Sequence, residues 1–450
     1  MTRAPAPSSE YRAALAALAA RGRFGIRLGL GRTRALLREL GDPQLAVRGA
    51  LVAGTNGKGS VLALAASALR RAGLRVGETP KPHLVSYRER IAVDGHPIGI
   101  EDFTRHVQAV LAVADRVARR HGEPTEFELL TAAVFRHFAE SDLDVALVEV
   151  GLGGRLDATH AWDGGVAVVT NVALDHMDRL GPTIPAIARE KAAIIERGDR
   201  AVTGADGDGL AVVRRRARRL GVSLTEVRPP PLLGWDRDGI EVELKRLGRT
   251  RVGLRGRHQG VNAAVADATL DALEAAGIAT ADDAARRAGY ASARWPGRLE
   301  RLEIDGVEVL LDGAHNPAGA AALAQALDDL RAFLAQGPLT LVVASMADKD
   351  VDGVIDALAA AQAVDGATVI ATSVEAARAR PAGDLAARWR ERVPGIADVE
   401  VRPDPIAAVD AALARAAAVG GPTVVAGSLY LVGAVRAHLV DDPELRDPSP

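Results

Sequence analysis

The segment Leu51-Val52-Ala53-Gly54-Thr55-Asn56-Gly57-Lys58-Gly59-Ser60 joins a short apolar run to the helical pattern VLALAASALRRAG of residues 61–73. A strand, a glycine-rich loop and a helix start in this order form an anion site, because backbone N–H groups point at phosphate oxygens and the helix dipole favours negative charge. Lys58 is spaced to reach the β and γ phosphates, and the hydroxyl of Ser60 or Thr55 to bind Mg²⁺. A turn that only connects strand to helix would not require three glycines, a lysine and an asparagine so close together. The segment predicts a nucleotide phosphate site.

Short apolar runs alternate with helical stretches on the C-terminal side of this loop. Residues 145–151 (VALVEVG) and 166–172 (VAVVTNV) are the clearest strand candidates. Strands that are apolar on both faces and separated by helices are typical of a parallel sheet covered by helices. An Asp94-Gly95 turn between two short apolar arms predicts a hairpin within residues 88–98.

The alternation starts again after Trp295-Pro296-Gly297-Arg298. The apolar runs VEVLLDG, LTLVVAS, ATVIATS, VEVRP and PTVVAGS follow, each with a helical stretch after it. This pattern predicts a second, smaller doubly wound domain. The predicted fold class is α/β, with an N-terminal P-loop parallel-sheet domain over residues 1–295 and a C-terminal Rossmann-like domain over residues 296–450.

The composition limits the partners and the compartment. The net charge of −2 gives no reason to expect a nucleic-acid partner, because a phosphate backbone requires a basic surface. The absence of cysteine excludes disulfides and thiolate metal sites and is compatible with a reducing compartment. The N-terminal residues lack the apolar stretch of a signal peptide, and no run of about 18 apolar residues occurs. We expect a cytoplasmic protein without a membrane segment, with disordered ends over the first eight and last ten residues.

Lysine and asparagine are rare in this chain. Of 56 lysine and arginine residues only five are lysines, and the four asparagines are Asn56, Asn171, Asn262 and Asn316. A guanidinium group does not lose its proton, so a lysine kept in an arginine-rich chain indicates a need for a compact ammonium or a titratable amine. All four asparagines and four of the five lysines lie in polar motifs. If a compositional bias had left these residues at random positions, they would not gather in such motifs.

The loop ending in Lys58-Gly59-Ser60 departs from the common G-x-x-x-x-G-K-[ST] pattern. It resembles the loop of the Mur ligase superfamily, most of all that of the folylpolyglutamate synthase and dihydrofolate synthase family. The resemblance runs in order along nearly the whole chain. Its further motifs are PHLVSYRERI (82–91), PTEFELLTA (124–132), EVGLGGRLDAT (149–159), TNVALDHMDRLG (170–181), IAREKAAII (187–195), HQGVNA (258–263), WPGRLE (295–300), LDGAHNP (311–317), DKD (348–350) and GSLYLVG (427–433).

The resemblance implies an ATP-dependent acid–amino-acid ligase that adds L-glutamate to dihydropteroate, to the glutamate tail of a folate, or to both. Because a carboxylate is a poor electrophile, ATP first converts it to an acyl phosphate, and the glutamate amine then displaces phosphate. Proteins of this family have the active site in a cleft between two domains and are commonly monomers. The implied ligands are ATP, Mg²⁺ at two sites, a pterin or folate, and L-glutamate.

The same resemblance assigns roles to individual residues. Lys191 matches a lysine that is carbamylated in the family, a modification that requires a neutral amine and hence a lowered pKa. The expected catalytic residues are Lys58, Lys191 and His176. The expected metal ligands are Ser60, Glu149, His176 and Lys191.

Without the resemblance, each of these residues also has a purely structural interpretation. Glu149 is consistent with a helix cap or an ion-pair partner, and His176 with a buried core histidine, because Mg²⁺ prefers oxygen ligands. Lys191 is consistent with an exposed helix lysine paired to a neighbouring glutamate.

Further residues are assigned to the nucleotide and to the other substrates. Besides the loop residues Gly54, Thr55, Asn56, Gly57, Lys58, Gly59 and Ser60, the nucleotide is expected to contact Asn262, Arg298, Asp312 and His315. The pterin and glutamate sites are expected to include Thr125, Phe127, Glu128, Leu156, Asp157, Ala158 and Ser428. Phe127 could stack on an aromatic ring, although a single phenylalanine is more often part of a core.

The departure from the family pattern that affects the metal site is at Lys81. Lys81 stands where the family usually has a serine that binds metal. A charged lysine does not bind Mg²⁺, so its side chain either points away as an exposed loop residue or replaces part of the charge of the metal with its ammonium. Both alternatives stay open on the sequence, and Lys81 is not included among the ligands.

Two other functions are consistent with the phosphate loop. A Mur-type ligase would join amino acids to a cell-wall precursor, and a P-loop NTPase switch would hydrolyse nucleotide without folate or glutamate. The motifs at residues 82–91 and 311–317 favour the folate family over a Mur-type cell-wall ligase. A P-loop NTPase switch would leave the C-terminal α/β domain unexplained. A non-catalytic binding module is the least consistent, because the phosphate and metal residues are all present. Which pterin is used and how long a glutamate tail is made stay open.

Overall fold

The computed structural model describes residues 9–22, 27–376 and 378–447 of the chain. The chain forms two compact units and passes between them more than once. Unit 1 takes in the described residues of Met1–Arg228, Val265–Gly289 and Pro443–Pro450, and unit 2 those of Pro229–Ala264 and Tyr290–Asp442. The predicted division into domains of residues 1–295 and 296–450 stays a prediction.

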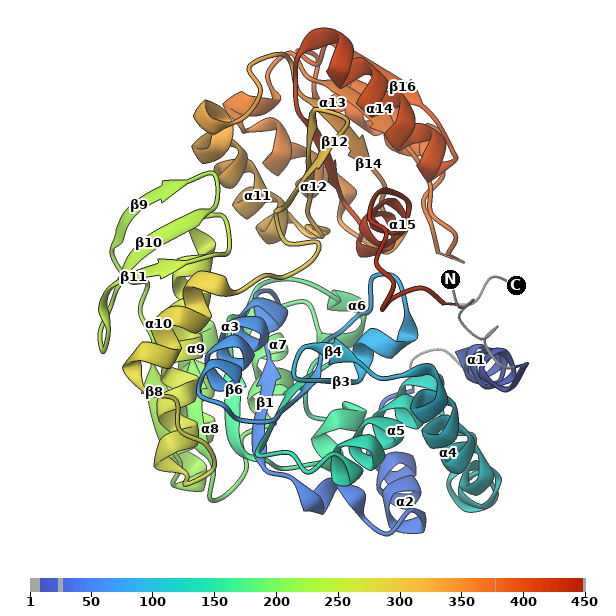
Figure 1. Cartoon of the computed structure of the whole chain (residues 1–450), viewed down its shortest axis with the longest axis vertical. Helices are drawn as coiled ribbons and strands as arrows, with labels where there is room; N and C mark the ends of the chain where they lie inside the picture. Colours follow the sequence, from blue (N-terminus) through green and yellow to red (C-terminus); the bar gives the residue numbers. More distant parts are fainter. Residues whose placement is uncertain (1–8, 23–26, 377, 448–450) are drawn as a thin grey trace, which may run out of the picture. The chain divides into compact units, whose positions relative to one another are not determined.

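Unit 1 is built on an eight-stranded sheet with the order β4-β3-β2-β5-β1-β6-β7-β8 (Figure 1). Its central strands β1 and β5 are buried along their whole length, as strands covered on both faces must be. The strands predicted within residues 51–53, 145–151 and 166–172 are confirmed. The parallel strands are β1 (Gly49–Ala53), β2 (Val76–Thr79), β5 (Val145–Glu149), β6 (Gly165–Val169), β7 (Arg200–Thr203) and β8 (Ser223–Glu226).

The strands β3 (Ala92–Val93) and β4 (His96–Pro97) extend the sheet beyond β2 as an antiparallel hairpin. The turn residues Asp94 and Gly95 have φ values of 55° and 85°. Positive φ at both central residues is the geometry of a hairpin turn that matches the strand twist. The predicted hairpin is therefore confirmed.

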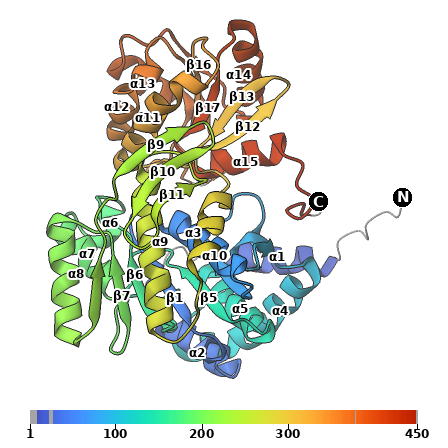
Figure 2. The ribbon, with the colours of Figure 1, turned by 60° about the vertical axis from the view of Figure 1, so that its left-hand side comes forward.

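Helices cover both faces of this sheet (Figures 1 and 2). On one face α3 (Lys58–Arg71) packs against α10 (Asp283–Ser292), where the Ser67 hydroxyl donates to the carbonyl of Gly289 at 2.8 Å. On the other face α5 (Glu126–Glu140) and α8 (Gly207–Leu220) contribute to the main core. The remaining elements are α1 (Ser9–Gly22), α2 (Gly31–Glu39), α4 (Ile100–His121), α6 (Met177–Leu180), α7 (Ile184–Ala192), α9 (His258–Ala275) and the short 3-10 helices η1 (Pro43–Ala46), η2 (Tyr87–Arg90) and η3 (Ala158–Ala161).

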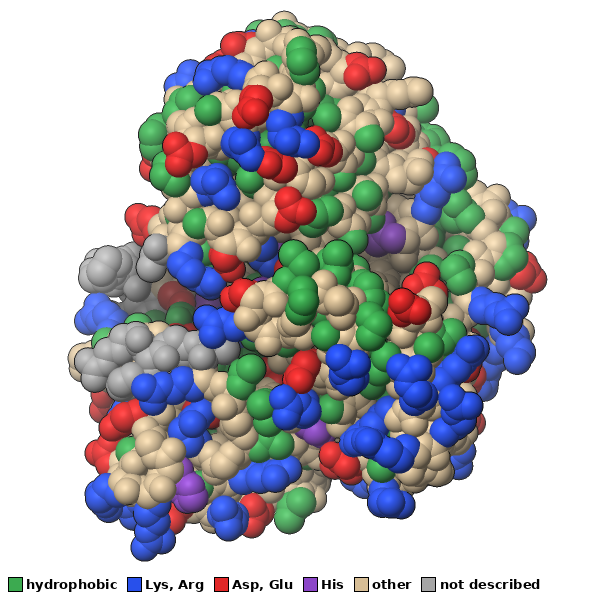
Figure 3. Space-filling view, turned by 180° about the vertical axis from the view of Figure 1, so that it is seen from behind, with side chains coloured by type: hydrophobic (Ala, Val, Ile, Leu, Met, Phe, Trp, Pro, Cys, Tyr) green, Lys and Arg blue, Asp and Glu red, His purple; other side chains and the backbone are tan. Residues whose placement is uncertain are grey.

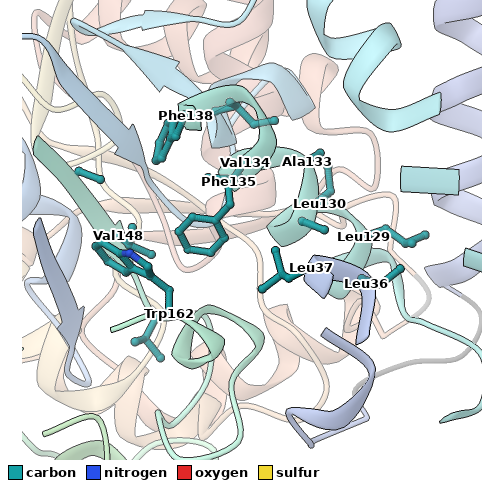
Figure 4. Close-up of a cluster of buried hydrophobic side chains, with 14 of the residues drawn as sticks. Leu36, Leu37, Leu129, Leu130, Ala133, Val134, Phe135, Phe138, Val148 and Trp162 are labelled. Carbon is teal, nitrogen blue, oxygen red and sulfur yellow. The ribbon is translucent and has the colours of Figure 1, made fainter. Parts of the chain in front are cut away.

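The main core of unit 1 lies between the sheet and the helices α2, α4 and α5. The ring of Phe135 lies against Trp162 with centroids 5.6 Å apart (Figure 4). Burying a large apolar side chain contributes about 1.5–3 kcal/mol, so this cluster stabilises the packing of the helices on the sheet around the central strand β5. The cluster in Figure 4 also contains Leu36, Leu37, Leu129, Leu130, Ala133, Val134, Phe138 and Val148.

Unit 2 contains two sheets. A six-stranded sheet has the order β12-β13-β17-β14-β15-β16, in which only β12 runs antiparallel. A separate antiparallel sheet is formed by β9 (Leu232–Asp236), β10 (Gly239–Leu244) and β11 (Gly248–Val252) (Figure 2). The strands of the larger sheet are β12 (Glu300–Ile304), β13 (Val307–Leu311), β14 (Thr340–Val343), β15 (Thr368–Ala371), β16 (Asp398–Val401) and β17 (Thr423–Ala426).

Every strand that the sequence predicts after residue 296 is present in the larger sheet. The helices that follow them are α11 (Pro317–Leu330), α12 (Val351–Ala359), α13 (Ala382–Arg392), α14 (Pro405–Val419) and α15 (Leu429–Leu439), with the 3-10 turns η4 (Arg331–Phe333) and η5 (Gln362–Val364). The predicted α/β fold class, with a parallel-sheet domain and a second doubly wound α/β domain, is confirmed. The sheet β9–β11 was not expected from the sequence.

The expectation of disordered ends is wrong for residues 441–447. The Asp447 carboxylate accepts hydrogen bonds from Tyr11 and Ser86, and the Glu444 carboxylate lies 3.0 Å from His96 Nδ1. Composition alone did not reveal these partners, because they come from distant parts of the sequence. Residues 1–8 and 448–450 lie outside the described residues.

The surface of unit 1 carries a local excess of positive charge. Figure 3 shows Lys and Arg side chains gathered where α8 lies. The exposed residues Arg214, Arg215, Arg218 and Arg219 belong to this helix, and Arg214 pairs with Glu226. Among the described helices, none has both the length and the apolar character needed to span a bilayer.

Candidate active site

The phosphate loop starts at the C-terminal end of β1 and ends in the first turn of α3. Gly54 has a φ of 157°, and a Cβ at this position would lie 1.8 Å from Thr170 Oγ1, so no larger residue fits. Gly57 has a φ of 80° and precedes the first helical residue, Lys58. Because β1 lies between β5 and β6, the loop is at the carboxyl edge of the parallel strands, where open α/β sheets bind ligands.

The segment after β6 supports this loop. Thr170 Oγ1 donates to the carbonyl of Asn56 at 2.7 Å, and Asn171 Oδ1 accepts from the N–H of Asn56 at 2.9 Å. Two of the four asparagines of the chain therefore meet here. The Thr55 hydroxyl bonds the backbone of Ala173 at 3.2 and 3.0 Å, which leaves Ser60, in the first turn of α3, as the better-placed hydroxyl for a cation.

Two lysines converge on the carbonyl of Gly54. Lys58 Nζ donates to it at 3.1 Å and to the carbonyl of Thr55 at 3.1 Å, while Lys191 Nζ donates to it at 2.9 Å. Lys191 is only 4% exposed, so the alternative of a surface helix lysine is wrong. Burial and then the Lys58 ammonium lower the pKa of Lys191 to about 7, although Asp175 and Asp157 act in the opposite direction. The lowered pKa expected from the sequence is confirmed.

Glu149 is buried at the end of β5. Its Oε1 lies 3.9 Å from Lys58 Nζ, and its Oε2 accepts from the backbone N–H of Lys81 at 3.0 Å. Glu149 thus faces the phosphate loop with a carboxylate that two cationic residues hold in place. No helix begins at this residue, so the helix-cap interpretation is wrong among the described elements.

The side chain of Lys81 points toward the backbone of Glu149 and not into solvent. Its Nζ donates to the carbonyl of Glu149 at 2.6 Å and lies 5.2 Å from the centroid of the Phe127 ring. Burial lowers the pKa of Lys81 to about 8, and the charges of Asp157 and Glu149 counteract it. The interpretation of Lys81 as an exposed loop residue is therefore wrong.

His176 lies at the start of the one-turn helix α6. Its φ of 49° is unusual for a residue other than glycine, and its N–H donates to Asp175 Oδ1 at 2.8 Å. Its side chain is 35% exposed, so the alternative of a core histidine is wrong. Its Nε2 lies 3.9 Å from Asp175 Oδ2, which is longer than a hydrogen bond.

No ready-made metal cluster is present among the residues that the structure describes: groups of three or more His, Asp and Glu side chains do not converge at one point. Mg²⁺ usually keeps one or two carboxylate ligands and completes its shell with substrate phosphates and water. The buried carboxylate of Glu149 beside the phosphate loop fits this pattern. The donor set present is therefore suited to a metal that arrives with a nucleotide.

The residues assigned to the pterin side are largely held by local contacts. Thr125 and Glu128 form the capping box of α5, and the Glu128 carboxylate also accepts from Arg32 Nε at 3.0 Å. Asp157 caps η3 and accepts from Leu152 N–H at 2.8 Å. The carboxylates of Glu128 and Asp157 are therefore both engaged in hydrogen bonds within the protein.

Phe127 and its neighbours form a more open candidate contact. A Cβ on Gly151 would lie 2.8 Å from Phe127 Cζ and 3.1 Å from Asp157 Oδ2, so Gly151 allows both side chains to approach the backbone after β5. The carbonyl of Leu156 accepts from the N–H of Gly29 at 3.2 Å, and Ala158 is buried in η3. The substrate roles of these residues stay predictions.

In unit 2 the assigned nucleotide residues gather at the carboxyl edge of β13. Asp312 Oδ2 accepts from Leu299 N–H at 2.9 Å and its Oδ1 from Ala314 N–H at 2.8 Å. Burial raises the pKa of Asp312, and the nearby Arg298 guanidinium opposes this. Arg298 Nη1 donates to the carbonyl of Gly297 at 3.0 Å, and His315 Nδ1 lies 2.8 Å from the carbonyl of Gly313.

The first turn of α9 brings further polar groups to unit 2. Asn262 Nδ2 donates to Gln259 Oε1 at 2.8 Å, and Gln259 contacts His258 at 3.1 Å. Burial and the Arg298 charge lower the pKa of His258 to about 4, so this imidazole is neutral at neutral pH. Ser428 is buried at the end of β17, where its hydroxyl accepts from Tyr430 N–H at 3.2 Å.

Some residues of the site were missed by the sequence analysis. Thr170, Arg32, His258 and Gln259 have side-chain contacts to assigned residues, yet none was singled out. His258, Gln259 and Thr170 lie inside motifs that the sequence analysis quoted, so the resemblance could have identified them. Arg32 is one of many arginines, and only the fold pairs it with Glu128.

Two family models match this chain. The model described as the Mur ligase middle domain covers residues 52–270, and the model described as the dihydrofolate synthetase C-terminal domain covers residues 298–438. The second model separates the chain from ligases that lack this C-terminal domain.

Curated relatives and solved structures agree with these matches. The dihydrofolate synthase/folylpolyglutamate synthase of Bacillus subtilis is 36% identical over 75% of this chain and 80% of its own length. The protein of the same name from Mycobacterium tuberculosis is 36% identical over 92% of this chain and 91% of its own length. The structure of Mycobacterium tuberculosis folylpolyglutamate synthase complexed with ADP and AMPPCP has a TM-score of 0.86 and 34% identity, covering 97% of this chain and 100% of that one.

Proposed function

The chain belongs to the dihydrofolate synthase/folylpolyglutamate synthase family, and we propose that it ligates L-glutamate to dihydropteroate, to the glutamate tail of a folate, or to both. It is an ATP-dependent acid–amino-acid ligase. The observation that carries the proposal is the phosphate loop with two amines on the carbonyl of Gly54 and the carboxylate of Glu149 beside them. This arrangement binds a polyphosphate and balances its charge.

The chemistry requires activation of a carboxylate. Its oxygen attacks the γ-phosphorus of ATP, the bond to the bridging oxygen breaks, and ADP leaves as an acyl phosphate forms. The glutamate amine then attacks the carbonyl carbon, phosphate leaves, and the amine loses a proton. In this proposal Lys58 binds the transferred phosphoryl group, and the backbone N–H groups of the loop orient the phosphates.

A divalent cation is expected with the nucleotide, because phosphoryl transfer requires neutralisation of the charge that develops on the phosphate oxygens. We assign the Ser60 hydroxyl, the Glu149 carboxylate and the His176 imidazole as its protein ligands. Glu149 is the best supported of the three, since it is buried, ionisable and directed at the loop. A second cation and Lys191 as its ligand are part of the proposal.

The proposal includes a carbamate on Lys191. The neutral amine adds to carbon dioxide and releases one proton, which converts a cation into a carboxylate-like anion. Lys191 is buried, adjacent to a second ammonium, and has a pKa near neutrality, so the neutral amine is populated. The conversion would also relieve the repulsion between Lys191 and Lys58 and supply an oxygen ligand for a cation.

We assign the remaining residues by the same argument from motif and chemistry. Asn262, Arg298, Asp312 and His315 of unit 2 bind the nucleotide, with Arg298 as the cation that approaches its phosphates. The pterin and glutamate sites include Thr125, Phe127, Glu128, Leu156, Asp157, Ala158 and Ser428. The protein acts as a monomer in the cytoplasm, a compartment compatible with a chain that lacks cysteine.

One assay tests the function. Purified protein is supplied with ATP, Mg²⁺, L-glutamate and either dihydropteroate or tetrahydrofolate, and ADP and the amide product are both measured. ADP release is expected only when the pterin compound and glutamate are both present, in a ratio of one ADP per amide bond. ADP release that does not depend on the pterin compound or on glutamate would identify a nucleotide hydrolase and overturn the ligase assignment.

A further inference from the structure

The last described residues of the chain belong to unit 1, and the carboxylate of Asp447 connects them to the rest of that unit. Asp447 Oδ1 accepts hydrogen bonds from the Tyr11 hydroxyl at 2.6 Å, from Ser86 Oγ at 2.8 Å and from Arg88 Nε at 3.3 Å. Tyr11 belongs to α1, Ser86 is the N-cap of η2 and Arg88 lies within η2. One acidic side chain of the C-terminal segment thus contacts two stretches of unit 1 that are far apart in the sequence.

The donors are themselves firmly held. Tyr11 is fully buried, and burial together with the Asp447 carboxylate raises its pKa, so the phenol keeps its proton and donates it. Arg88 is 5% exposed, its Nη1 donates to the carbonyl of Ile98 at 3.1 Å, and its Nη2 donates to the carbonyls of Glu444 and Arg446. Charge-assisted hydrogen bonds of this kind are the stronger class, so the C-terminal segment is a structural part of unit 1.

The segment that Asp447 holds is the loop of residues 81–91. The Glu89 carboxylate accepts from the backbone N–H groups of Leu84, Val85 and Ser86, at 3.1, 2.7 and 2.7 Å. Ser86 also caps η2 through Arg88 N–H. The Glu89 carboxylate therefore fixes residues 84–86, and Arg90 Nε donates to His83 Nδ1 at 2.8 Å nearer the beginning of the loop.

The beginning of the same loop contacts the candidate active site. Lys81 donates from its backbone to Glu149 Oε2 and from its side chain to the carbonyl of Glu149, and its ammonium lies over the ring of Phe127. Residues 82–85 separate this contact from Ser86. Displacement of Ser86 and Arg88 would therefore move Lys81 relative to Glu149 and Phe127.

We infer that Asp447 is a positioning residue for the 81–91 loop and, through Lys81, for the side of the site that binds the pterin or folate. The inference rests on the proposed function for the identity of that substrate. It assigns a role to the C-terminal segment of the chain in substrate binding without any contact between Asp447 and a substrate. Asp447 acts by holding Ser86 and Arg88, and the nucleotide loop is held independently by Thr170 and Asn171.

The test compares D447N with S86A and with the control E444Q in the full chain. E444Q removes the same charge from the same segment, but its partner His96 is exposed. For D447N and S86A we expect the KM for the pterin substrate to rise about tenfold, while the KM for ATP changes less than about twofold. E444Q is expected to leave both constants within about twofold.

A measurement that does not depend on catalysis accompanies the kinetics. Hydrogen exchange at the amides of Leu84, Val85 and Ser86 is expected to accelerate about tenfold in D447N and S86A and to stay unchanged in E444Q. Unchanged exchange and unchanged KM values in D447N would overturn the inference. Accelerated exchange in a protein that shows no ligase activity in any variant would support the role of Asp447 in holding the loop and overturn the proposed function instead. Equal rises in the KM for ATP and for the pterin would show a general loss of structure and contradict the specific role.

Discussion

Two ammonium groups on one carbonyl oxygen define the chemistry of Lys191. Lys58 and Lys191 both donate to Gly54 O, and neither can move away without losing a hydrogen bond in a buried site. The loss of solvation on burial, and then the repulsion from Lys58, favour a neutral amine at Lys191. Since its pKa is about 7, the neutral fraction falls about tenfold for each pH unit below neutrality.

We predict that Lys191→Ala lowers ligase activity about 100-fold or more and that added formate or acetate restores part of it. The substitution leaves space for a small carboxylate where the carbamate would stand, which is the physical reason for the rescue. Activity is measured with and without formate, and ¹³C NMR of protein in labelled bicarbonate detects the carbamate. The wild-type carbamate signal is expected to weaken as the pH falls below about 7, because protonated amine does not add carbon dioxide.

The matched control for this experiment is Lys245→Ala, at an exposed lysine. It should keep full activity and the complete carbamate signal. Full activity of Lys191→Ala, or a carbamate signal that persists in it, would rule out the modification.

We predict that Lys81→Ser lowers the Mg²⁺ concentration needed for half-maximal activity about fivefold. Removal of the ammonium beside Glu149 leaves the carboxylate with less neighbouring positive charge, which strengthens its attraction for a divalent cation by roughly 1 kcal/mol. Activity is titrated with Mg²⁺, and Mn²⁺ binding in the presence of nucleotide is followed by electron paramagnetic resonance. Lys245→Ser is the control, and an unchanged metal dependence of Lys81→Ser would show that the ammonium does not affect the cation site.

Part of this site could be predicted from single residues, and part could not. The rarity of lysine and asparagine directed attention to Lys58, Lys191 and Asn171, which the structure brings to one loop. The direction of Lys81 could not be predicted, because a loop residue between two prolines has no periodicity that fixes its side chain. Thr125 and Glu128 also form the capping box of α5, a spacing that the sequence analysis did not use.

The pair of helices α4 and α5 contains a buried histidine that sets its acid stability. His106 is fully buried, and burial followed by the Arg105 charge lowers its pKa to about 4. The unfolded chain takes up a proton near pH 6.5 that the folded protein does not accept until about pH 4, so the free energy of unfolding falls as the pH drops through this window. The charged and titratable groups around it are Asp102, Arg105, Arg136, His137 and Glu140.

We predict that His106 lowers the free energy of unfolding of unit 1 by on the order of 2 kcal/mol between about pH 7 and about pH 5, a contribution that is lost in His106→Gln. Glutamine retains hydrogen-bonding capacity but does not titrate. Urea unfolding is followed at both pH values, with His438→Gln as the control at an exposed histidine paired to Asp410. Equal pH dependence of wild type and His106→Gln would contradict the assignment.

Elements with a strong pattern were predictable, and elements that depend on partners were not. The parallel strands β1, β5 and β6 are apolar on both faces, and burial alone specifies them. The strand β9 alternates half-buried and exposed residues and exposes Trp235, so it lacks the apolar run that identified the others. The C-terminal segment is polar, and the donors to Asp447 come from distant parts of unit 1, at Tyr11, Ser86 and Arg88.

Residues assigned to nucleotide binding lie in both units. A substitution in unit 2 therefore tests whether this unit takes part in the reaction. Arg298 follows Pro296-Gly297 and lies close to Asp312 and His258, whose pKa values its charge affects. Its guanidinium is fixed by a 3.0 Å hydrogen bond to Gly297 O, and it belongs to the motif assigned to the nucleotide. If unit 2 takes part in phosphoryl transfer, this cation contributes to transition-state stabilisation and not only to the stability of unit 2.

We predict that Arg298→Ala lowers kcat/KM for ATP about 100-fold, with a melting temperature within a few degrees of wild type. Arg298→Lys should recover only part of the activity, because an ammonium cannot reproduce the planar bidentate contact of a guanidinium with phosphate. Arg237→Ala is the control, since it removes an exposed arginine of the same unit that pairs with Glu308, a contact worth little in solvent. Steady-state ligation and the affinity for a fluorescent ATP analogue are measured for all three. Full activity of Arg298→Ala would confine nucleotide chemistry to unit 1 and leave unit 2 with the other substrates alone.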